Sequence, residues 1–226
     1  MNIHEYGTEN RNVLVLIHPS LVMWDYFEYV IPLLSPFFHL VIPALPGYDP
    51  DSSGDFTSVE QIASELADWL IAHGHSEVCG VYGCSMGGSI VIRMLTDSRL
   101  RIRSAMIDGG IRLLQKAFSA DEYSGDDLQY IAGVLRMISA KTVWRTFESC
   151  NNYPMPDPVR TSCRNIEYWL ADAEIKARKL DITYIRQHFP DARFRRFRNL
   201  GHGGLAVLQP DKFVKSVRFV TGRPEI

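Results

Sequence analysis

Ser85 stands in a sequence context that suits a nucleophilic serine. It lies at the centre of Gly83-Cys84-Ser85-Met86-Gly87, after an apolar run at 78–82 that predicts a buried strand and before 89–95, which is typical of a helix. Strand, Gly-x-Ser-x-Gly and helix in this order form a nucleophile elbow, whose strained turn exposes the serine hydroxyl. Glycines at the two flanking positions leave room for so tight a turn. The alternative is a glycine-rich turn of another α/β domain, so the motif needs partners elsewhere in the chain.

A serine hydroxyl is a weak nucleophile at neutral pH and needs a base within hydrogen-bond reach. Among the seven histidines, His202 is the best candidate, because it lies in the glycine-rich loop 199–204 directly after the last predicted strand. Such a loop lies at the carboxyl edge of an α/β sheet, where these sheets place their ligand sites. Four others are expected to be structural or exposed, within a strand or at helix ends: His39, His73, His75 and His188.

The base in turn needs a carboxylate that fixes its tautomer and stabilises the imidazolium. Asp172 and Glu174 follow an apolar strand predicted over 165–171, between the serine and the histidine in the chain. Asp108 ends the preceding predicted strand and is a third candidate. Acids at a helix N-terminus are also favoured by the helix dipole, without any catalytic role. The residues alone therefore leave the acid open among these three.

Backbone N–H groups must also be aimed at the oxyanion of a tetrahedral intermediate. Met86, directly after the serine, supplies one such N–H group. The second should come from the loop after the apolar run 13–17, and we expect it from Ser20, because Pro19 has no N–H to donate.

The elements that must position these residues alternate between strands and helices. This alternation predicts an α/β fold with a mostly parallel central sheet and helices on both faces. Thr57 and Glu60 form a capping-box signature at the start of a helix that Gly74 ends. Strands are expected over 2–6, 13–17, 39–42, 78–82, 104–108, 165–171 and 192–198, and the other helices over about 24–34, 89–95, 174–188 and 210–220.

Residues 112–164 break this alternation. They show helical stretches at 128–136 and 141–147 but no strand pattern, and they are too hydrophobic for a linker and too few for an independent domain. We therefore expect one domain over 1–226 with 112–164 as a helical cap inserted in it. Five apolar residues of the cap either line an acyl pocket or form its own core: Met137, Trp144, Phe147, Tyr153 and Met155.

Composition narrows the function classes further. The chain has 226 residues, 46% apolar and 22% charged, as in an ordinary globular protein, and its net charge of −2 gives no sign of a nucleic-acid partner. The basic and aromatic stretch 193–198 is more simply an edge strand that shows its charges to solvent. No run approaches the roughly 18 to 20 apolar residues of a membrane span. The start of the chain resembles no signal peptide, so a cytoplasmic location is expected.

The four cysteines show neither a Cys-x-x-Cys pair nor the Cys/His spacing of a metal site: Cys79, Cys84, Cys150 and Cys163. Cys84 neighbours the nucleophile but should pack beneath the elbow. We expect no cofactor and no metal. The expected partner is a small acyl substrate, and we allow for a homodimer.

Together these features resemble the α/β-hydrolase superfamily over essentially the whole chain. Four landmarks carry the resemblance and follow the order of the family. They are the oxyanion strand and loop at 13–20 with Trp24 downstream, 43–48 in place of its Asp-Leu-Pro-Gly-His loop, the Ser-Met-Gly-Gly elbow, and the histidine loop Gly201-His202-Gly203-Gly204.

The resemblance implies a serine hydrolase that cleaves a carboxylic ester or similar acyl bond through an acyl-enzyme. It favours Glu174 as the acid, because Ala171-Asp172-Ala173-Glu174 aligns with the family's Gly-x-x-Asp segment. Two further departures are Pro19, where the family has glycine, and a short N-terminus, which implies that the first of the usual eight strands is absent. C–C hydrolases, thioesterases and amidases use the same triad, and a small-molecule receptor with little turnover is an alternative of another class.

Overall fold

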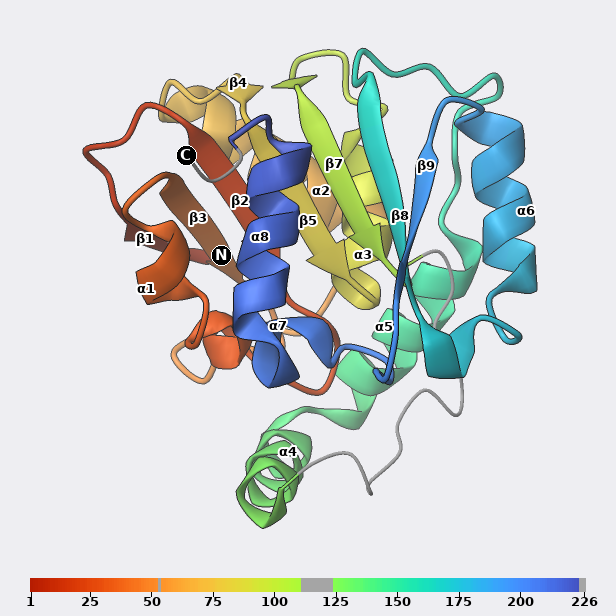
Figure 1. The fold of residues 1–226 in the computed structure, drawn as a ribbon. Helices are drawn as coiled ribbons and strands as arrows, with labels where there is room; N and C mark the ends of the chain where they lie inside the picture. Colours follow the sequence, from red (N-terminus) through yellow and green to blue (C-terminus); the bar gives the residue numbers. More distant parts are fainter. Residues whose placement is uncertain (53, 111–123, 224–226) are drawn as a thin grey trace.

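The computed structural model describes residues 1–52, 54–110 and 124–223. Its main sheet has seven strands in the order β1-β3-β2-β5-β7-β8-β9 (Figure 1). β1 is antiparallel to β3, and every other neighbouring pair in this sheet is parallel. The predicted mostly parallel sheet is thereby confirmed. The strands are β1 Asn2–Tyr6, β2 Val13–Ile17, β3 His39–Ala44, β5 Gly80–Cys84, β7 Ser104–Asp108, β8 Asn165–Ala171 and β9 Arg193–Phe197, and β4 Glu77–Val78 pairs separately with β6 Arg101–Ile102.

Helices cover both faces of the sheet (Figure 1). Successive residues of a strand point to opposite faces, so each strand contributes side chains to both cores. In β2, Leu14 and Leu16 belong to the core beneath α1 (Ile31–Leu34) and α8 (Pro210–Val220). Val13, Val15 and Ile17 belong to the core on the other face, beneath α2 (Val59–Ala72), α3 (Met86–Met94) and α6 (Lys179–His188). Burial on both faces explains the continuous apolar runs of these strands.

The carboxyl ends of the parallel strands meet at one edge of the sheet. Ile17 pairs with Gly83, Cys84 with Asp108, and Ala171 with Phe197. The loops that follow these strands therefore emerge side by side. The residues that the sequence predicts for the site lie at these strand ends or in the segments that follow them: Ser20, Ser85, Met86, Glu174 and His202, with the alternatives Asp108 and Asp172.

Several predicted helices have different bounds in the structure. For example, α3 spans Met86–Met94 in place of the expected 89–95. The helix expected over 24–34 is divided into η1 (Trp24–Phe27) and α1, and the one expected from 174 consists of η3 (Asp172–Glu174) followed by α6. The N-cap of α2 is Ser58, whose hydroxyl accepts from Gln61 N, so the capping box predicted at Thr57 is wrong by one residue. The first residue of α2 also makes a tertiary contact: Val59 N donates to Ser149 Oγ at 2.8 Å.

The described part of the predicted cap contains two helices, α4 (Gly125–Met137) and α5 (Ala140–Asn152), which lie beyond the carboxyl edge of the sheet in Figure 1. Hydroxyl groups one helical turn apart fasten α5 to the rest of the protein. Thr142 Oγ1 accepts from Phe56 N at 3.1 Å, and Thr146 Oγ1 bonds Tyr48 OH at 2.9 Å. Residues 112–123 of the predicted cap lie outside the described residues.

The apolar residues of this segment divide into two groups. Met137, Trp144 and Phe147 are 41%, 66% and 42% exposed, so they do not form a core within the segment. Tyr153 and Met155 pack against the main core instead.

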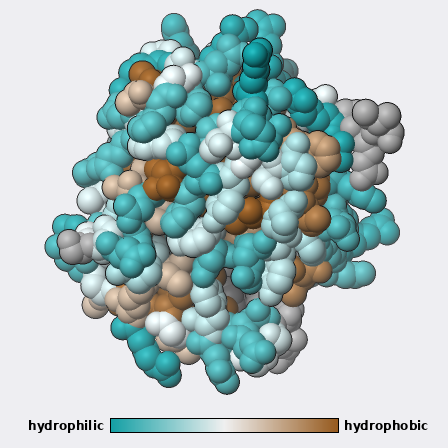
Figure 2. Space-filling view, turned by 90° about the vertical axis from the view of Figure 1, so that its left-hand side faces the viewer, coloured by the Kyte–Doolittle hydropathy of each residue, from teal (hydrophilic) through white to brown (hydrophobic). Residues whose placement is uncertain are grey.

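Polar residues protect the two outer strands of the sheet, β9 and β1. On β9, Arg195 Nε pairs with Glu167 Oε2 of β8 at 2.7 Å, and Arg196 pairs with Asp172. Figure 2 looks onto the side of the molecule where β1 lies, and hydrophilic residues cover most of it with only scattered apolar patches. Within the described residues, no helix is long and apolar enough to cross a membrane.

The approach of α3 to β2 generates a stability prediction. A Cβ at Gly87 would lie 2.2 Å from Ile17 O and 2.9 Å from His18 O, and backbone oxygens cannot yield as a flexible side chain would. We expect Gly87→Ala to lower the free energy of unfolding by about 3 kcal/mol or more, at the upper end of the cost of overpacking. Urea denaturation followed by circular dichroism measures this loss.

Gly133→Ala is the matched control for this experiment. Gly133 lies within α4, and its added Cβ would meet nothing within 4 Å. The change should leave the stability unchanged or raise it by up to about 1 kcal/mol. Equal midpoints for the two variants would contradict the close approach at Gly87.

Candidate active site

Ser85 sits at the turn between β5 and α3 with a strained backbone. Its φ of 53° and ψ of −116° lie in a region that residues with a Cβ rarely adopt. The turn is held from both sides: Ser85 N donates to Asp108 O at 2.9 Å, and a Cβ at Gly83 would lie only 2.1 Å from Gly87 O. The structure thus has the predicted sequence of strand, tight turn and helix, with glycine where the backbones touch.

His202 contacts Glu174 at the same edge of the sheet. Its Nδ1 lies 2.8 Å from Glu174 Oε2, and both side chains are buried. Because an ionised carboxylate only accepts hydrogen bonds, this contact favours the tautomer of neutral His202 with the proton on Nδ1 and the lone pair on Nε2. Arg178 Nη2, which only donates, lies farther from Nδ1, at 3.1 Å. This tautomer is the one that a general base for a serine hydroxyl requires.

The other two predicted acids have different partners. Asp172 lies at the surface, where its carboxylate binds Arg196. Asp108 is buried, and its Oδ2 accepts from Tyr82 OH at 2.8 Å. Burial, followed by the nearby charge of Glu174, raises the pKa of Asp108 to about 6. Glu174 is therefore the candidate that contacts the imidazole.

The end of β7 links the histidine to the serine turn. Gly109 has a φ of 61°, and a Cβ there would lie 3.1 Å from His202 Cε1 and 3.0 Å from Glu174 Oε1. Asp108, the residue before it, accepts the Ser85 N–H described above. On the other side, a Cβ at Gly203 would lie 3.7 Å from Cys84 Sγ. Cys84, beside Ser85, and Gly203, beside His202, therefore lie close together, and Cys84 is fully buried.

The two predicted oxyanion donors lie directly after Ser85 and in the loop after β2. Met86 begins α3, so its N–H has no acceptor within the helix. Ser20 lies in the loop after β2, close to the point where Gly87 touches Ile17 and His18. His18 is fully buried, and burial lowers its pKa to about 4 despite the opposing hydrogen bond to Pro19. The neutral His18 donates from Nδ1 to Pro19 O at 2.8 Å and so braces this loop.

Arg178 belongs to the site, although the sequence analysis did not identify it. Its fully buried guanidinium donates from Nε to Glu174 Oε2 at 3.0 Å and from Nη1 to Asp181 Oδ2 at 3.1 Å. Its Nη2 lies 3.1 Å from His202 Nδ1. The spacing i, i+4 between Glu174 and Arg178 is a sequence signal that could have revealed the first of these contacts.

The charge of Arg178 acts on the carboxylate that His202 contacts. Burial alone would raise the pKa of Glu174, but the hydrogen bond and charge of His202 and the charge of Arg178 outweigh it, and the pKa lies below its ordinary value. Glu174 therefore stays ionised throughout the neutral range despite its burial.

Tyr26 and Tyr130 connect the loop after β2 to other parts of the site. Tyr26 OH donates to Gly203 O at 2.7 Å and so anchors the histidine loop. Tyr130 of α4 accepts from Met23 N at 3.0 Å and donates to Asp25. Neither contact is visible as a motif, because each joins segments more than 100 residues apart.

Comparisons with known proteins identify the family to which the chain belongs. A model of the alpha/beta hydrolase family matches residues 14–216. A protein from Desulfitobacterium hafniense described as of that family is similar with a TM-score of 0.80 at 18% identity, over 97% of this chain and 99% of the other.

Two other solved structures are similar over comparable lengths. An esterase from a marine microorganism has a TM-score of 0.76 at 16% identity, over 97% of this chain and 98% of its own. Est816, an N-acyl homoserine lactone degrading enzyme, has 0.77 at 14% identity, over 96% and 95%. At such identities these likenesses show the fold alone. The family model spans most of the sequence, and the chain accordingly belongs to the alpha/beta hydrolase family and is a hydrolase by class.

Proposed function

We propose that this protein is a serine hydrolase that cleaves a carboxylic ester or a similar acyl bond of a small molecule through a Ser85–His202–Glu174 triad. The observation that carries the proposal is the 2.8 Å contact between His202 Nδ1 and Glu174 at the sheet edge where the strained Ser85 turn lies. Two similar structures are described as an esterase and as an N-acyl homoserine lactone degrading enzyme, and both descriptions are compatible with an acyl substrate.

In the proposed mechanism, Ser85 Oγ attacks the carbonyl carbon while His202 Nε2 takes its proton. Glu174 stabilises the imidazolium that forms. The N–H groups of Met86 and Ser20 donate to the oxyanion, and loss of one such donor typically costs about 3 to 4 kcal/mol of barrier.

His202 next returns the proton to the leaving alkoxide, and the acyl group stays on Ser85. A water molecule then gives its proton to His202 and attacks the acyl-enzyme. The second tetrahedral intermediate then collapses, and His202 returns the proton to Ser85 Oγ as the acid is released and the serine hydroxyl is restored. No cofactor takes part in these steps.

Arg178 would act as a positioning residue for the triad acid. A carboxylate buried as deeply as Glu174 tends to take up a proton, and a protonated acid would not stabilise the imidazolium. The guanidinium opposes this protonation and also fixes the direction of the carboxylate through the Nε–Oε2 hydrogen bond.

The segment 112–164 would serve as a lid that selects the substrate. Its described helices lie beyond the sheet edge that carries the site, and Trp144 and Phe147 of α5 expose apolar surface. Tyr130 joins α4 to the loop after β2, so that the lid and the oxyanion loop would respond together to a substrate.

The activated serine is tested with a fluorophosphonate probe. The wild-type protein should be labelled, and Ser85→Ala should not be, because only a serine paired with a base reacts at a useful rate. The same substitution should lower kcat on a p-nitrophenyl ester by about 10⁴-fold or more. Absence of labelling in a well-folded wild-type protein would instead favour a receptor with little turnover.

The choice of acid is tested by paired amide substitutions. Glu174→Gln should lower kcat by roughly 10³- to 10⁴-fold, because an amide can impose the wrong tautomer on His202 and cannot stabilise its charge. Asp172→Asn, matched in chemistry two residues away, should keep most of the activity, since Asp172 binds Arg196. Steady-state kinetics on one ester distinguishes them, and the reverse result would make Asp172 the acid.

Arg178→Met tests the positioning role. Without the guanidinium the pKa of Glu174 rises, so the carboxylate becomes protonated at a higher pH and the acid limb of kcat/KM should move upward. Removing one partner of a buried ion pair should also cost about 3 to 5 kcal/mol of stability. The pH profile separates the two roles, because a residue that only supports the fold would lower stability and leave the acid limb in place.

Arg178→Lys accompanies this experiment in case the methionine variant folds poorly. Lysine keeps the positive charge but cannot bond Glu174 and Asp181 in the same fork-like manner. We expect an acid limb close to that of the wild type and a lower kcat. An acid limb shifted as far as in Arg178→Met would contradict the role assigned to the charge.

A further inference from the structure

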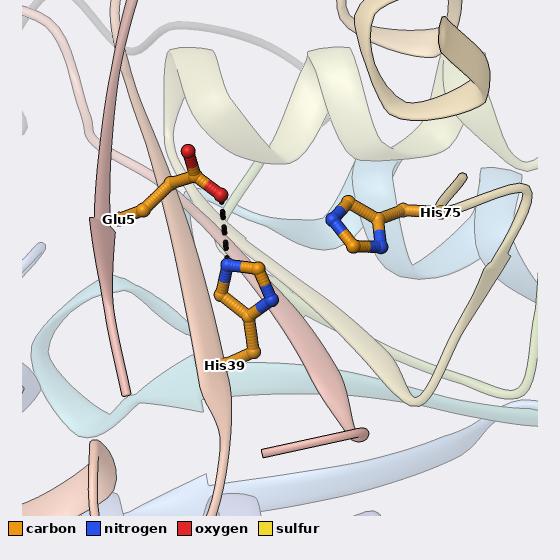
Figure 3. A group of neighbouring side chains, drawn as sticks. All are labelled: Glu5, His39 and His75. Carbon is orange, nitrogen blue, oxygen red and sulfur yellow. Dashed lines mark hydrogen bonds and ion pairs between the residues drawn. The ribbon is translucent and has the colours of Figure 1, made fainter. Parts of the chain in front are cut away.

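A second group of titratable side chains lies at the opposite end of the strands from Ser85. Glu5 of β1, His39 at the start of β3 and His75 after α2 face one another there (Figure 3). His39 Nε2 lies 2.8 Å from Glu5 Oε1, and the rings of His39 and His75 have centroids 5.0 Å apart. One potential ligand atom from each residue lies within 4.8 Å of the other two.

The register of the sheet places Glu5 beside His39. Glu5 pairs with Val41 in the antiparallel ladder, and His39 lies two residues before Val41 on the same strand face. Glu5 and His39 are therefore diagonal neighbours across the two strands, a distance that long side chains can span. Val41 belongs to the core beneath α2, so the pair faces the side of the sheet that α2 covers.

The end of α2 places His75 over this pair. Gly74 has a φ of 78°, its N–H donates to Ile71 O at 3.1 Å, and His75 N donates to Leu70 O at 2.7 Å. These two hydrogen bonds form a Schellman motif, which fixes the residue after the glycine relative to the last turn of the helix. Backbone hydrogen bonds thus position His75, as the strand register positions the other two residues.

Two imidazole nitrogens and one carboxylate oxygen form a donor set that suits Zn²⁺ and similar first-row divalent ions. Ca²⁺ and Mg²⁺ prefer oxygen ligands throughout. With metal–ligand bonds of about 2.1 Å, the ligands of a tetrahedral ion lie about 3.4 Å apart. The Glu5–His39 contact is slightly tighter than this, and the remaining separations within 4.8 Å require the His75 ring to approach by about an ångström.

We propose that Glu5, His39 and His75 bind one Zn²⁺ ion per chain, with a fourth position left to water. Such an ion ties three segments together: the edge strand β1, the start of β3 and the end of α2. β1 is the outermost strand of the sheet and has β3 as its neighbour. A metal bond from Glu5 would therefore connect β1 to the end of α2 as well. The ion would stabilise the fold at a distance from the triad edge.

Zinc binding and thermal unfolding of EDTA-treated protein test this proposal. We expect one Zn²⁺ per chain by equilibrium dialysis, a higher melting temperature with zinc, and the intense visible absorption of tetrahedral Co²⁺ when cobalt replaces it. Glu5→Gln and His75→Gln should each weaken binding by more than the roughly 10- to 100-fold typical of losing an outer-shell partner. Glu5 is exposed and His75 is half-buried, so both variants should fold.

His73→Gln is the matched control, two residues from His75 on the same turn. Its ring stacks on Trp69 and its Nδ1 bonds Trp69 O, so its Nδ1 already has a backbone partner. This variant should bind zinc as the wild type does. Equal losses in His73→Gln and His75→Gln would reveal a surface histidine pair in place of the proposed site. Unchanged affinity in Glu5→Gln, or no binding by the wild type, would also overturn the proposal.

Discussion

The strained turn at Ser85 is the constraint on which the candidate site depends. A residue with a Cβ holds a φ of 53° only where its surroundings leave no alternative. Here α3 touches the end of β2 through Gly87, and a Cβ on Gly88 would lie 2.5 Å from Gly110 Cα after β7. The helix is therefore fixed against the strands on both sides of β5. The same contacts bring the end of β2 and the end of β7 to the serine turn.

The second constraint is the burial of two neighbouring carboxyl groups, whose pKa values shift in opposite directions. Asp108 and Glu174 are both buried at the sheet edge, yet the pKa of Asp108 rises to about 6 while that of Glu174 falls. Burial and the charge of Glu174 raise the pKa of Asp108, and the hydrogen bond from Tyr82 offsets them only in part. For Glu174, the contacts with His202 and Arg178 outweigh the effect of burial. Environments that separate the pKa values of neighbouring acids are typical of sites that assign them different roles. Glu174 is thereby the carboxylate suited to remain ionised beside the imidazole.

Much of this arrangement could be predicted from the sequence, because its signals are local. Apolar runs identified the strands, with the bounds of β1, β2, β7 and β8 as predicted. The glycines around Ser85 and His202 marked the two tight loops at the same sheet edge. The roles of these residues and of Glu174 remain predictions, although the contact between Glu174 and His202 agrees with the order of preference among the three acids.

The remaining features depend on contacts that a local pattern does not contain. The capping box failed at Thr57 because Ser58 caps α2, where Val59 bonds a serine of α5 some 90 residues away. The i, i+4 spacing of Glu174 and Arg178 is that of an ordinary salt bridge on a helix surface. Only the complete burial of Arg178 shows that it belongs to the site. Tyr26 reaches Gly203 across 177 positions.

The two ends of the sheet explain how one fold could hold a reactive site and a separate metal site. Parallel strands place all their carboxyl ends together, and the loops there are free to vary around a rigid scaffold. At the other end, short connections bring strand starts and helix ends into contact, as at His39 and His75. Residues at this end can stabilise the scaffold without touching the candidate active site. Glu5 joins them only because β1 runs antiparallel and so returns to the start of β3. The single reversed strand therefore makes possible a cluster that an entirely parallel sheet would not assemble from these residues.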